Sequence, residues 1–126
     1  MIVGVGHDLV HVPRIARMLA RWGRRFLDRV FSRAEQRYCL AFAEPAAHFA
    51  ARFAAKEALY KAVSRGRRVR LGFRDAQVVH EEGVTLALKL SPRGRALLAR
   101  TGATDVHVTL SHDGEYASAV VMIEAR

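Results

Sequence analysis

Cysteine is nearly absent from this sequence, which has only Cys39 among its 126 residues. One thiol can form neither an internal disulfide nor a cysteine-based zinc site. No segment approaches the roughly 20 apolar residues of a membrane-spanning helix, and the segment after Met1 lacks the basic stretch that opens a secretion signal. We therefore expect a cytoplasmic protein in a reducing compartment, with no membrane partner.

Acidic residues are also few: 12 Asp and Glu stand against 21 Lys and Arg, a formal net charge of +9. Most of the basic residues are arginine, whose guanidinium group binds phosphates and carboxylates alike. The charge predicts an acidic partner, which could be a nucleic acid, a phosphorylated cofactor or an acidic protein. Hydrophobic residues make up 51% of the chain, enough for one core at this length but not for two. We expect residues 1–126 to form a single domain.

The hydrophobic periodicity predicts an α+β fold, in which one strand is followed by helices and then mostly by strands. One helix should begin at Pro13 and end or bend at Gly23, and Ser32 with Glu35 has the spacing of a helix capping box. The expected helices then cover 32–43, 46–63 and 91–100. The expected strands are 2–12, 76–80, 84–90, 105–110 and 116–124, with turns at 81–83 and 113–114.

The first expected strand carries a carboxylate on the same side as two glycines. Gly4, Gly6 and Asp8 alternate along it and so share one face. Leu9 stands where a dinucleotide-binding loop needs its third glycine, so this is not a Rossmann motif. Asp8 needs a cation, a donor or water if it is buried, and a metal or catalytic role competes with that of a strand-end residue facing solvent.

Four charged residues interrupt the alanine-rich helix expected at 46–63. Arg52 and Lys56 share one face, and Glu57 and Lys61, four residues apart, share another. A surface ion pair is the simplest account of Glu57 and Lys61, but the surrounding alanines leave little exposed surface for one. Asp8 and Glu57 could instead hold a hard divalent cation such as magnesium, with Lys61 facing the same phosphates.

The strand expected from Asp105 alternates polar and apolar side chains. His107, Thr109 and Ser111 lie on one face, which could be a solvent face or a binding face. Ser111, His112 and Asp113 are residue types of a hydrolase triad, but consecutive strand residues point to opposite faces and cannot relay a proton.

Three segments together resemble a known family. They are residues 3–10 (VGVGHDLV), 52–62 (RFAAKEALYKA) and 106–113 (VHVTLSHD), the last followed by Tyr116 and Ala117. In this order and at this spacing, over essentially the whole chain, they are similar to holo-acyl-carrier-protein synthase, the small bacterial type of 4′-phosphopantetheinyl transferase.

The resemblance implies transfer of the 4′-phosphopantetheine arm of coenzyme A to a serine of an apo acyl carrier protein, with release of adenosine 3′,5′-bisphosphate. It implies that Asp8 and Glu57 hold magnesium and that Lys61 neutralises pyrophosphate charge. It also implies contacts from Arg52, His107 and Thr109 to the nucleotide end of coenzyme A, and from the loop at Gly66 to phosphate. The fold implied is that of the family, with helices packed on a mostly antiparallel sheet and a homotrimer that places the sites at subunit interfaces.

The first helix gives the acidic partner a place to bind. Its arginines are expected to form a stripe beside the apolar face, and the resemblance implies that an acidic carrier protein docks there. The stripe comprises Arg14, Arg17, Arg21, Arg24 and Arg25, and the docking residues implied are Arg14, Met18, Arg21 and Arg24. A nucleic-acid-binding module and a catalytically inactive subunit remain alternatives, although the stripe has only Trp22 and Phe26 as aromatics, and both fit its core side.

Overall fold

The structure, a computed structural model, describes residues 1–81 and 85–126 and has the α+β fold that the periodicity predicts. Its helices are α1 (Val12–Trp22), α2 (Arg24–Val30), α3 (Arg33–Leu40), α4 (Pro45–Ser64) and α5 (Pro92–Arg100), with a short 3-10 turn, η1 (Phe73–Asp75). Its strands are β1 (Ile2–His11), β2 (Ala76–Glu81), β3 (Thr85–Leu90), β4 (Asp105–Asp113) and β5 (Tyr116–Glu124). Among the described residues, no helix is long and apolar enough to cross a membrane.

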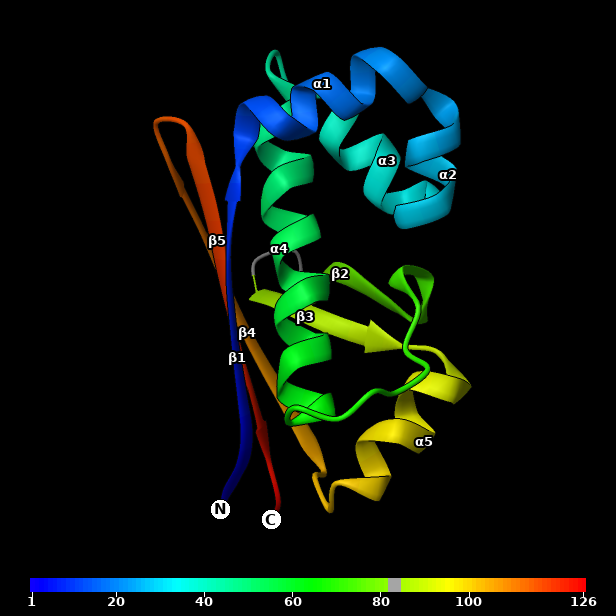
Figure 1. Cartoon of the computed structure of the whole chain (residues 1–126), viewed down its shortest axis with the longest axis vertical. Coiled ribbons are helices and arrows are strands. Elements are labelled where there is room, and N and C mark those ends of the chain that lie inside the picture. The colour runs from blue at the N-terminus through cyan, green and yellow to red at the C-terminus, as the bar shows by residue number, and fades with distance from the viewer. Residues whose placement is uncertain (82–84) are drawn as a thin grey trace.

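Two antiparallel sheets enclose the long helix α4. Strands β1, β5 and β4 form the larger sheet in that order, and β2 pairs with β3. Figure 1 shows α4 between the larger sheet and the β2–β3 hairpin, with α1 to α3 gathered at one end and α5 at the other. The predicted hairpins are confirmed in pairing, but most of the turn expected at 81–83, and the first residue of the strand expected at 84–90, lie outside the described residues.

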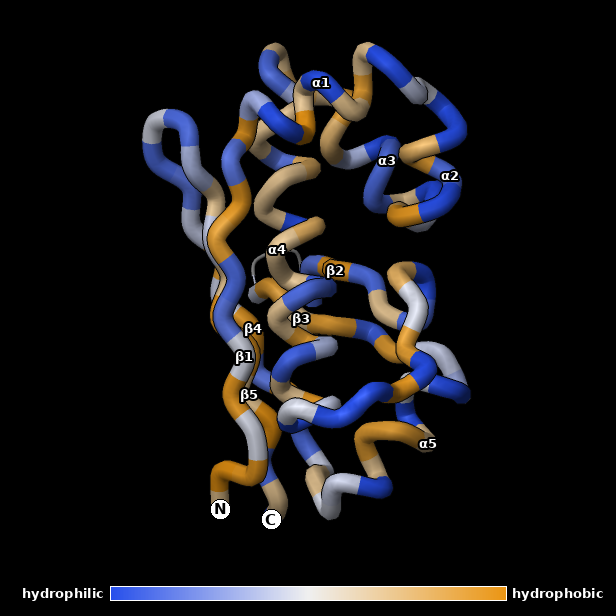
Figure 2. The backbone as a smooth tube through the Cα atoms, in the orientation of Figure 1, coloured by the Kyte–Doolittle hydropathy of each residue, from blue (hydrophilic) through white to orange (hydrophobic). Residues whose placement is uncertain are grey.

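Helix α4 forms the centre of the core because it is apolar on almost every side. Its alanines are nearly all buried, together with Phe49, Leu59 and Val63. Figure 2 shows this helix as a mostly hydrophobic tube between the sheets, whereas α1 and α2 carry hydrophilic stretches. Cys39 packs against the same core, and burial raises the pKa of its thiol to about 12, which keeps it protonated and unreactive.

The helix expected from Ser32 ends early, and the residues after Gly23 form a separate helix. The capping box at Ser32 and Glu35 is confirmed, but α3 ends at Leu40 rather than near residue 43, because the next backbone N–H groups bond only three residues back. Gly23 has a φ of 51° and ends α1. Arg24 and Arg25 therefore belong to α2, and the expectation of one arginine stripe on a single helix is wrong.

Two glycines let β1 approach α4 at van der Waals distance. A Cβ at Gly6 would collide with the backbone carbonyl of Ala58, and one at Gly4 with that of Ala62. Two residues of strand advance about 6.6 Å, and four residues of helix about 6 Å, so strand and helix stay in step. Asp8, two residues beyond Gly6 on the same face of β1, is thereby held against α4, close enough to raise the pKa of Glu57.

Substituting Gly6 with alanine should therefore displace β1 from α4. We expect a loss of about 1–3 kcal/mol or more in the free energy of unfolding, because the colliding atoms belong to the backbone and cannot rotate away. Urea denaturation measures the change. Gly72→Ala is the control, since Gly72 has a φ of −85° and its added methyl would make only one contact, with the Asp75 carboxylate. Equal stability of the two variants would contradict the close approach.

Candidate active site

Asp8 and Lys61 form an ion pair between β1 and α4. The Lys61 ammonium lies 3.1 Å from Oδ1 of Asp8 and donates a second hydrogen bond, of 2.9 Å, to the backbone carbonyl of His7. The Asp8 side chain is 18% exposed and that of Lys61 51%, so the pair lies at the edge of the core with its cation open to solvent. A phosphate could therefore reach Lys61 without unfolding any element.

Glu57 lies one helical turn before Lys61 and feels the charge of Asp8. Its pKa is raised, first by burial and then by the negative charge of Asp8, and these effects outweigh the lowering by Lys61 and Arg14. Two carboxylates from positions 49 residues apart thus share one environment, as the sequence predicts. An added cation would relieve both the burial cost and the repulsion.

The donor set suits magnesium better than a transition metal. Among the described residues no three His, Cys, Asp or Glu side chains come together, so a closed zinc-type site is absent from that part of the chain. Magnesium is commonly bound by one or two carboxylates, with waters and substrate phosphates filling its other positions. Asp8 and Glu57 fit that pattern.

Arg52 lies apart from these groups. It is 4% exposed, its guanidinium carbon is 4.3 Å from the centre of the Tyr38 ring, and its Nη1 donates to the carbonyl of His48 at 3.4 Å. The Nε atom of Arg52 is buried and has no partner in the described structure. It therefore keeps a donor for a ligand, but within one chain it is not brought together with Asp8.

His107 and Thr109 lie on the far face of the larger sheet. Both are exposed and pair across β5 with Met122 and Val120, whose side chains point away from α4, and His107 contacts Glu124 at 2.9 Å. Gly66 is exposed just after the end of α4. None of the three lies beside Asp8 in the same chain, so of the predicted site residues the structure gathers only Asp8, Glu57 and Lys61.

The predicted docking residues lie on α1 and α2, three of them at the surface. Arg14, Arg21 and Arg24 are exposed, and Met18 is half-buried in the wall of a hollow of about 270 Å³. The other lining residues of this hollow are Trp22, Arg25, Phe26 and Arg29. The positive charge of Arg14 lowers the pKa of Glu57, so this arginine lies near the carboxylate site.

A buried ion pair next to Glu57 was not predicted. The Lys56 ammonium lies 2.9 Å from Oε1 of Glu35, and both side chains are almost completely buried. Burial lowers the pKa of Lys56 more than Glu35 raises it. A lysine in a helix with so little exposed surface indicates that a buried acidic partner lies nearby. The sequence does not show that Glu35 is this partner, because its role in the capping box already explains its presence.

Comparison with known proteins identifies the family. The sequence profile of the 4′-phosphopantetheinyl transferase superfamily matches residues 4–121. The chain belongs to that superfamily. A holo-[acyl-carrier-protein] synthase from Gloeobacter violaceus is 45% identical over 94% of this chain and 90% of its own. The synthase from Syntrophus aciditrophicus is 40% identical over 98% of this chain and 97% of its own.

Superfamily members of known structure share the fold. The ACPS–CoA complex from Chronobacterium ammoniagenes superposes with a TM-score of 0.82 at 34% identity, covering 98% of this chain and 97% of that one. The resemblance drawn from the three sequence motifs is thereby confirmed, as is the combination of helices with antiparallel sheets.

Proposed function

We propose that this chain is a holo-acyl-carrier-protein synthase, which transfers the 4′-phosphopantetheine group of coenzyme A to a serine hydroxyl of an apo acyl carrier protein. The convergence of Asp8, Glu57 and Lys61 carries the proposal, because it gathers the groups that phosphoryl-type transfer requires. The names of the similar proteins, and the coenzyme A in one of their structures, support the same reaction.

The chemistry assigns a task to each side chain. The serine oxygen bonds to the phosphorus that carries the pantetheine arm, while the bond from that phosphorus to the bridging oxygen breaks and adenosine 3′,5′-bisphosphate leaves. The Lys61 ammonium faces the phosphate oxygens and stabilises the charge that collects on them. Glu57 is the proposed acceptor of the serine proton, since it is a carboxylate at the same site as Lys61 and Asp8.

Asp8 and Glu57 would hold a magnesium ion in this site. When bound, the ion polarises the phosphoryl oxygens and neutralises their charge. Burial and the charge of Asp8 raise the pKa of Glu57, so this site favours an added positive charge and has reason to bind such a cation. The Asp8 carboxylate is held in place on its strand by the hydrogen bond from Lys61.

The basic surface of α1 and α2 would bind the carrier protein. Acyl carrier proteins are acidic, and arginines such as Arg14 and Arg21 would attract them and orient the serine toward Glu57. The ring of Trp22 has the guanidinium carbons of Arg21 and Arg25 at 5.0 and 5.7 Å from its centre. Trp22 is exposed but Phe26 is buried, so α1 and α2 offer one exposed ring and not the series of rings on which bases stack, which favours an acidic protein over nucleic acid.

A homotrimer would complete the site. The outer face of the larger sheet exposes Val5 (56%), Leu9 (58%) and Met122 (38%), a row of apolar side chains that a second copy would cover. His107 and Thr109 lie on the same face and would then meet a neighbouring subunit's site. This arrangement accounts for their separation from Asp8 within one chain.

The reaction is tested by intact-mass spectrometry of an apo acyl carrier protein incubated with this chain, coenzyme A and magnesium. We expect the carrier protein to gain the mass of one phosphopantetheine, and a chelator to abolish the gain. The carrier protein must be one that another phosphopantetheinyl transferase modifies. If its mass stays unchanged with this chain, the proposed activity is contradicted. A gain that persists with the chelator would contradict the role of magnesium only.

A further inference from the structure

The C-terminal end of α4 is strongly basic. Residues 65–70 (RGRRVR) contain four arginines and follow the helix directly, and α5 carries three more. Figure 1 shows α5 at this end of the molecule, beside the segment that leaves α4. All seven arginines are exposed, and none of them forms an ion pair with residues 1–81 or 85–126.

The acids nearest to these arginines in the sequence are engaged elsewhere. Asp75 accepts a hydrogen bond of 2.8 Å from the hydroxyl of Ser91. Asp105 accepts one of 2.7 Å from Nε of Arg126. The positive charge at this end of α4 is therefore left for a ligand.

Three of the arginines line a hollow of about 170 Å³ between the end of α4 and α5. They are Arg65, Arg67 and Arg100, and the apolar part of the lining comes from Val63, Val69 and Leu97. A cavity of about 150 Å³ can hold a benzene ring, so this hollow has room for one small ring or a short branched chain. It thus combines positive charge with an apolar surface of limited size.

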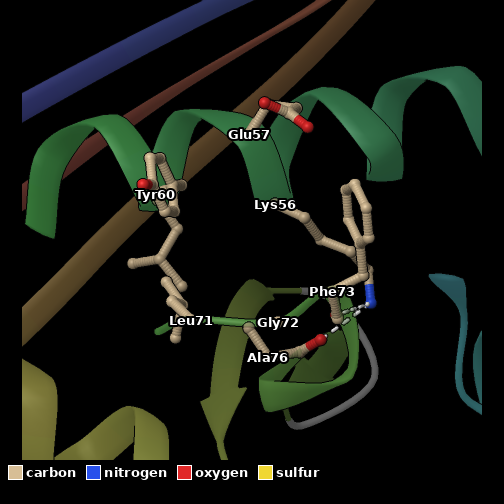
Figure 3. Close-up of a pocket in the computed structure, with 8 residues that line it drawn as sticks. Lys56, Glu57, Tyr60, Leu71, Gly72, Phe73 and Ala76 are labelled. Atoms are coloured by element: carbon tan, nitrogen blue, oxygen red, sulfur yellow. Dashed lines mark hydrogen bonds between the residues drawn. The ribbon is translucent and has the colours of Figure 1, made fainter. Parts of the chain in front are cut away.

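This hollow is separate from the carboxylate site. Glu57 lines the larger hollow that Figure 3 shows, of about 270 Å³, so that one belongs to the carboxylate site. Among the described residues, the two hollows have no lining residue in common. Asp8, Lys61 and Gly66, which are proposed to act on coenzyme A or its magnesium, do not line the hollow at the end of α4.

The backbone at Arg65 points to a use for its side chain. Arg65 has a φ of 48°, in the left-handed region that L side chains disfavour, and its N–H closes α4 by donating to the carbonyl of Lys61. Glycine is the usual residue at this position after a helix, because it adopts that φ without strain. Helix closure alone therefore does not explain an arginine here, whereas a side chain that lines a binding site does.

The charge of the hollow favours a phosphate over a carboxylate. A helix C-terminus carries a charge equivalent to about −0.5, so the ends of α4 and α5 together offset about one of the three guanidinium charges. A phosphate monoester carries about −1.5 to −2 at neutral pH and so matches the remainder, whereas a carboxylate carries a single charge. The guanidinium group also donates two parallel hydrogen bonds to phosphate oxygens.

We propose that this hollow binds a small organic phosphate, at a site distinct from that of coenzyme A. The phosphate group lies among Arg65, Arg67 and Arg100 and relieves their mutual repulsion. A compact apolar group attached to the phosphate packs on the apolar part of the lining and is thereby removed from water. The inference does not depend on the proposed function, because no group of the carboxylate site takes part.

Phenyl phosphate is the probe, since it joins one phosphate to one ring. Isothermal titration calorimetry is done without magnesium, so that the carboxylates of Asp8 and Glu57 repel phosphate at the other site. We expect saturable binding that Arg67→Gln or Arg100→Gln weakens about tenfold or more, because each removes charge-assisted hydrogen bonds. Arg93→Gln is the matched control: it removes an exposed charge from α5 outside the hollow and should bind as the wild type does.

Two further ligands test the assigned chemistry. Benzoate has the ring with a carboxylate, and inorganic phosphate lacks the ring, so both should bind more weakly than phenyl phosphate. If either binds as tightly as phenyl phosphate, the assigned ligand class is overturned.

The variants decide where the phosphate binds. Absence of saturable binding, or equal weakening by Arg93→Gln, would overturn the site, the latter because it would indicate attraction by overall charge. Binding that Lys61→Met abolishes and Arg67→Gln leaves unchanged would place the phosphate at the carboxylate site and also overturn the proposal. Arg67 and Arg100 are both exposed, so their variants should fold, as thermal melting checks. Loss of transferase activity in any assay would bear on the proposed function and not on this site.

Discussion

Glu57→Gln is expected to lower the rate of carrier-protein modification by about 10²–10⁴-fold, because it removes both a magnesium ligand and a proton acceptor. The substitution keeps the shape of the side chain and should leave the fold intact. Initial rates from intact-mass spectrometry at saturating coenzyme A measure the loss. Glu81→Gln, at an exposed glutamate at the end of β2, is the control and should keep wild-type rates.

The same variant should be at least as stable as the wild type at neutral pH. The raised pKa of Glu57 means that the folded chain holds this proton more tightly than the unfolded chain does. Stability is therefore lost as the pH rises from the unfolded pKa through the folded one, and glutamine removes that loss. Melting temperatures should favour Glu57→Gln at pH 8, with the difference shrinking toward pH 4. A variant that is both inactive and much less stable at pH 8 would indicate a structural role instead.

Lys56→Met should have the largest effect on stability, a loss of about 3–5 kcal/mol in the free energy of unfolding. It leaves the Glu35 carboxylate buried without its cation, and the carbonyls of Phe73 and Ala76 without a donor. Urea denaturation, followed by circular dichroism, measures the loss.

Lys61→Met on the same helix is the matched control for this prediction. Its ammonium is half-exposed and its ion pair with Asp8 is open to solvent, so its removal should cost about 1 kcal/mol or less. Transferase activity should fall strongly in this control, since Lys61 faces the phosphates. Similar stability losses in both lysine variants would show that the buried Lys56–Glu35 pair contributes no more to stability than the exposed Lys61–Asp8 pair.

Local sequence signals account for most of the fold. The capping box of Ser32 and Glu35 gives the start of α3, and Asp113 with Gly114 gives the turn between β4 and β5. Such signals act between near neighbours, so their geometry follows from the residues themselves. Gly23 is harder to interpret. The sequence shows that this glycine can interrupt a helix, but not that it adopts a positive φ and that a separate helix begins after it.

The carboxylate site could be predicted because Asp8 and Glu57 occupy apolar elements where an unpaired acid is costly. The ion pair of Lys56 with Glu35 could not be predicted, because Glu35 already has a role as a cap and no local signal joins it to a lysine 21 residues later. The placement of His107 and Thr109 also needs the sheet, since alternation alone gives two faces without saying which one packs on α4.

The most direct test of the account is a crystal structure of the chain with coenzyme A and Mn²⁺, a stand-in for magnesium that anomalous scattering can locate. The account predicts one ion bound by the carboxylates of both Asp8 and Glu57 and contacting the pyrophosphate of coenzyme A. An ion bound by neither side chain, with the pyrophosphate held elsewhere on the chain, would contradict it.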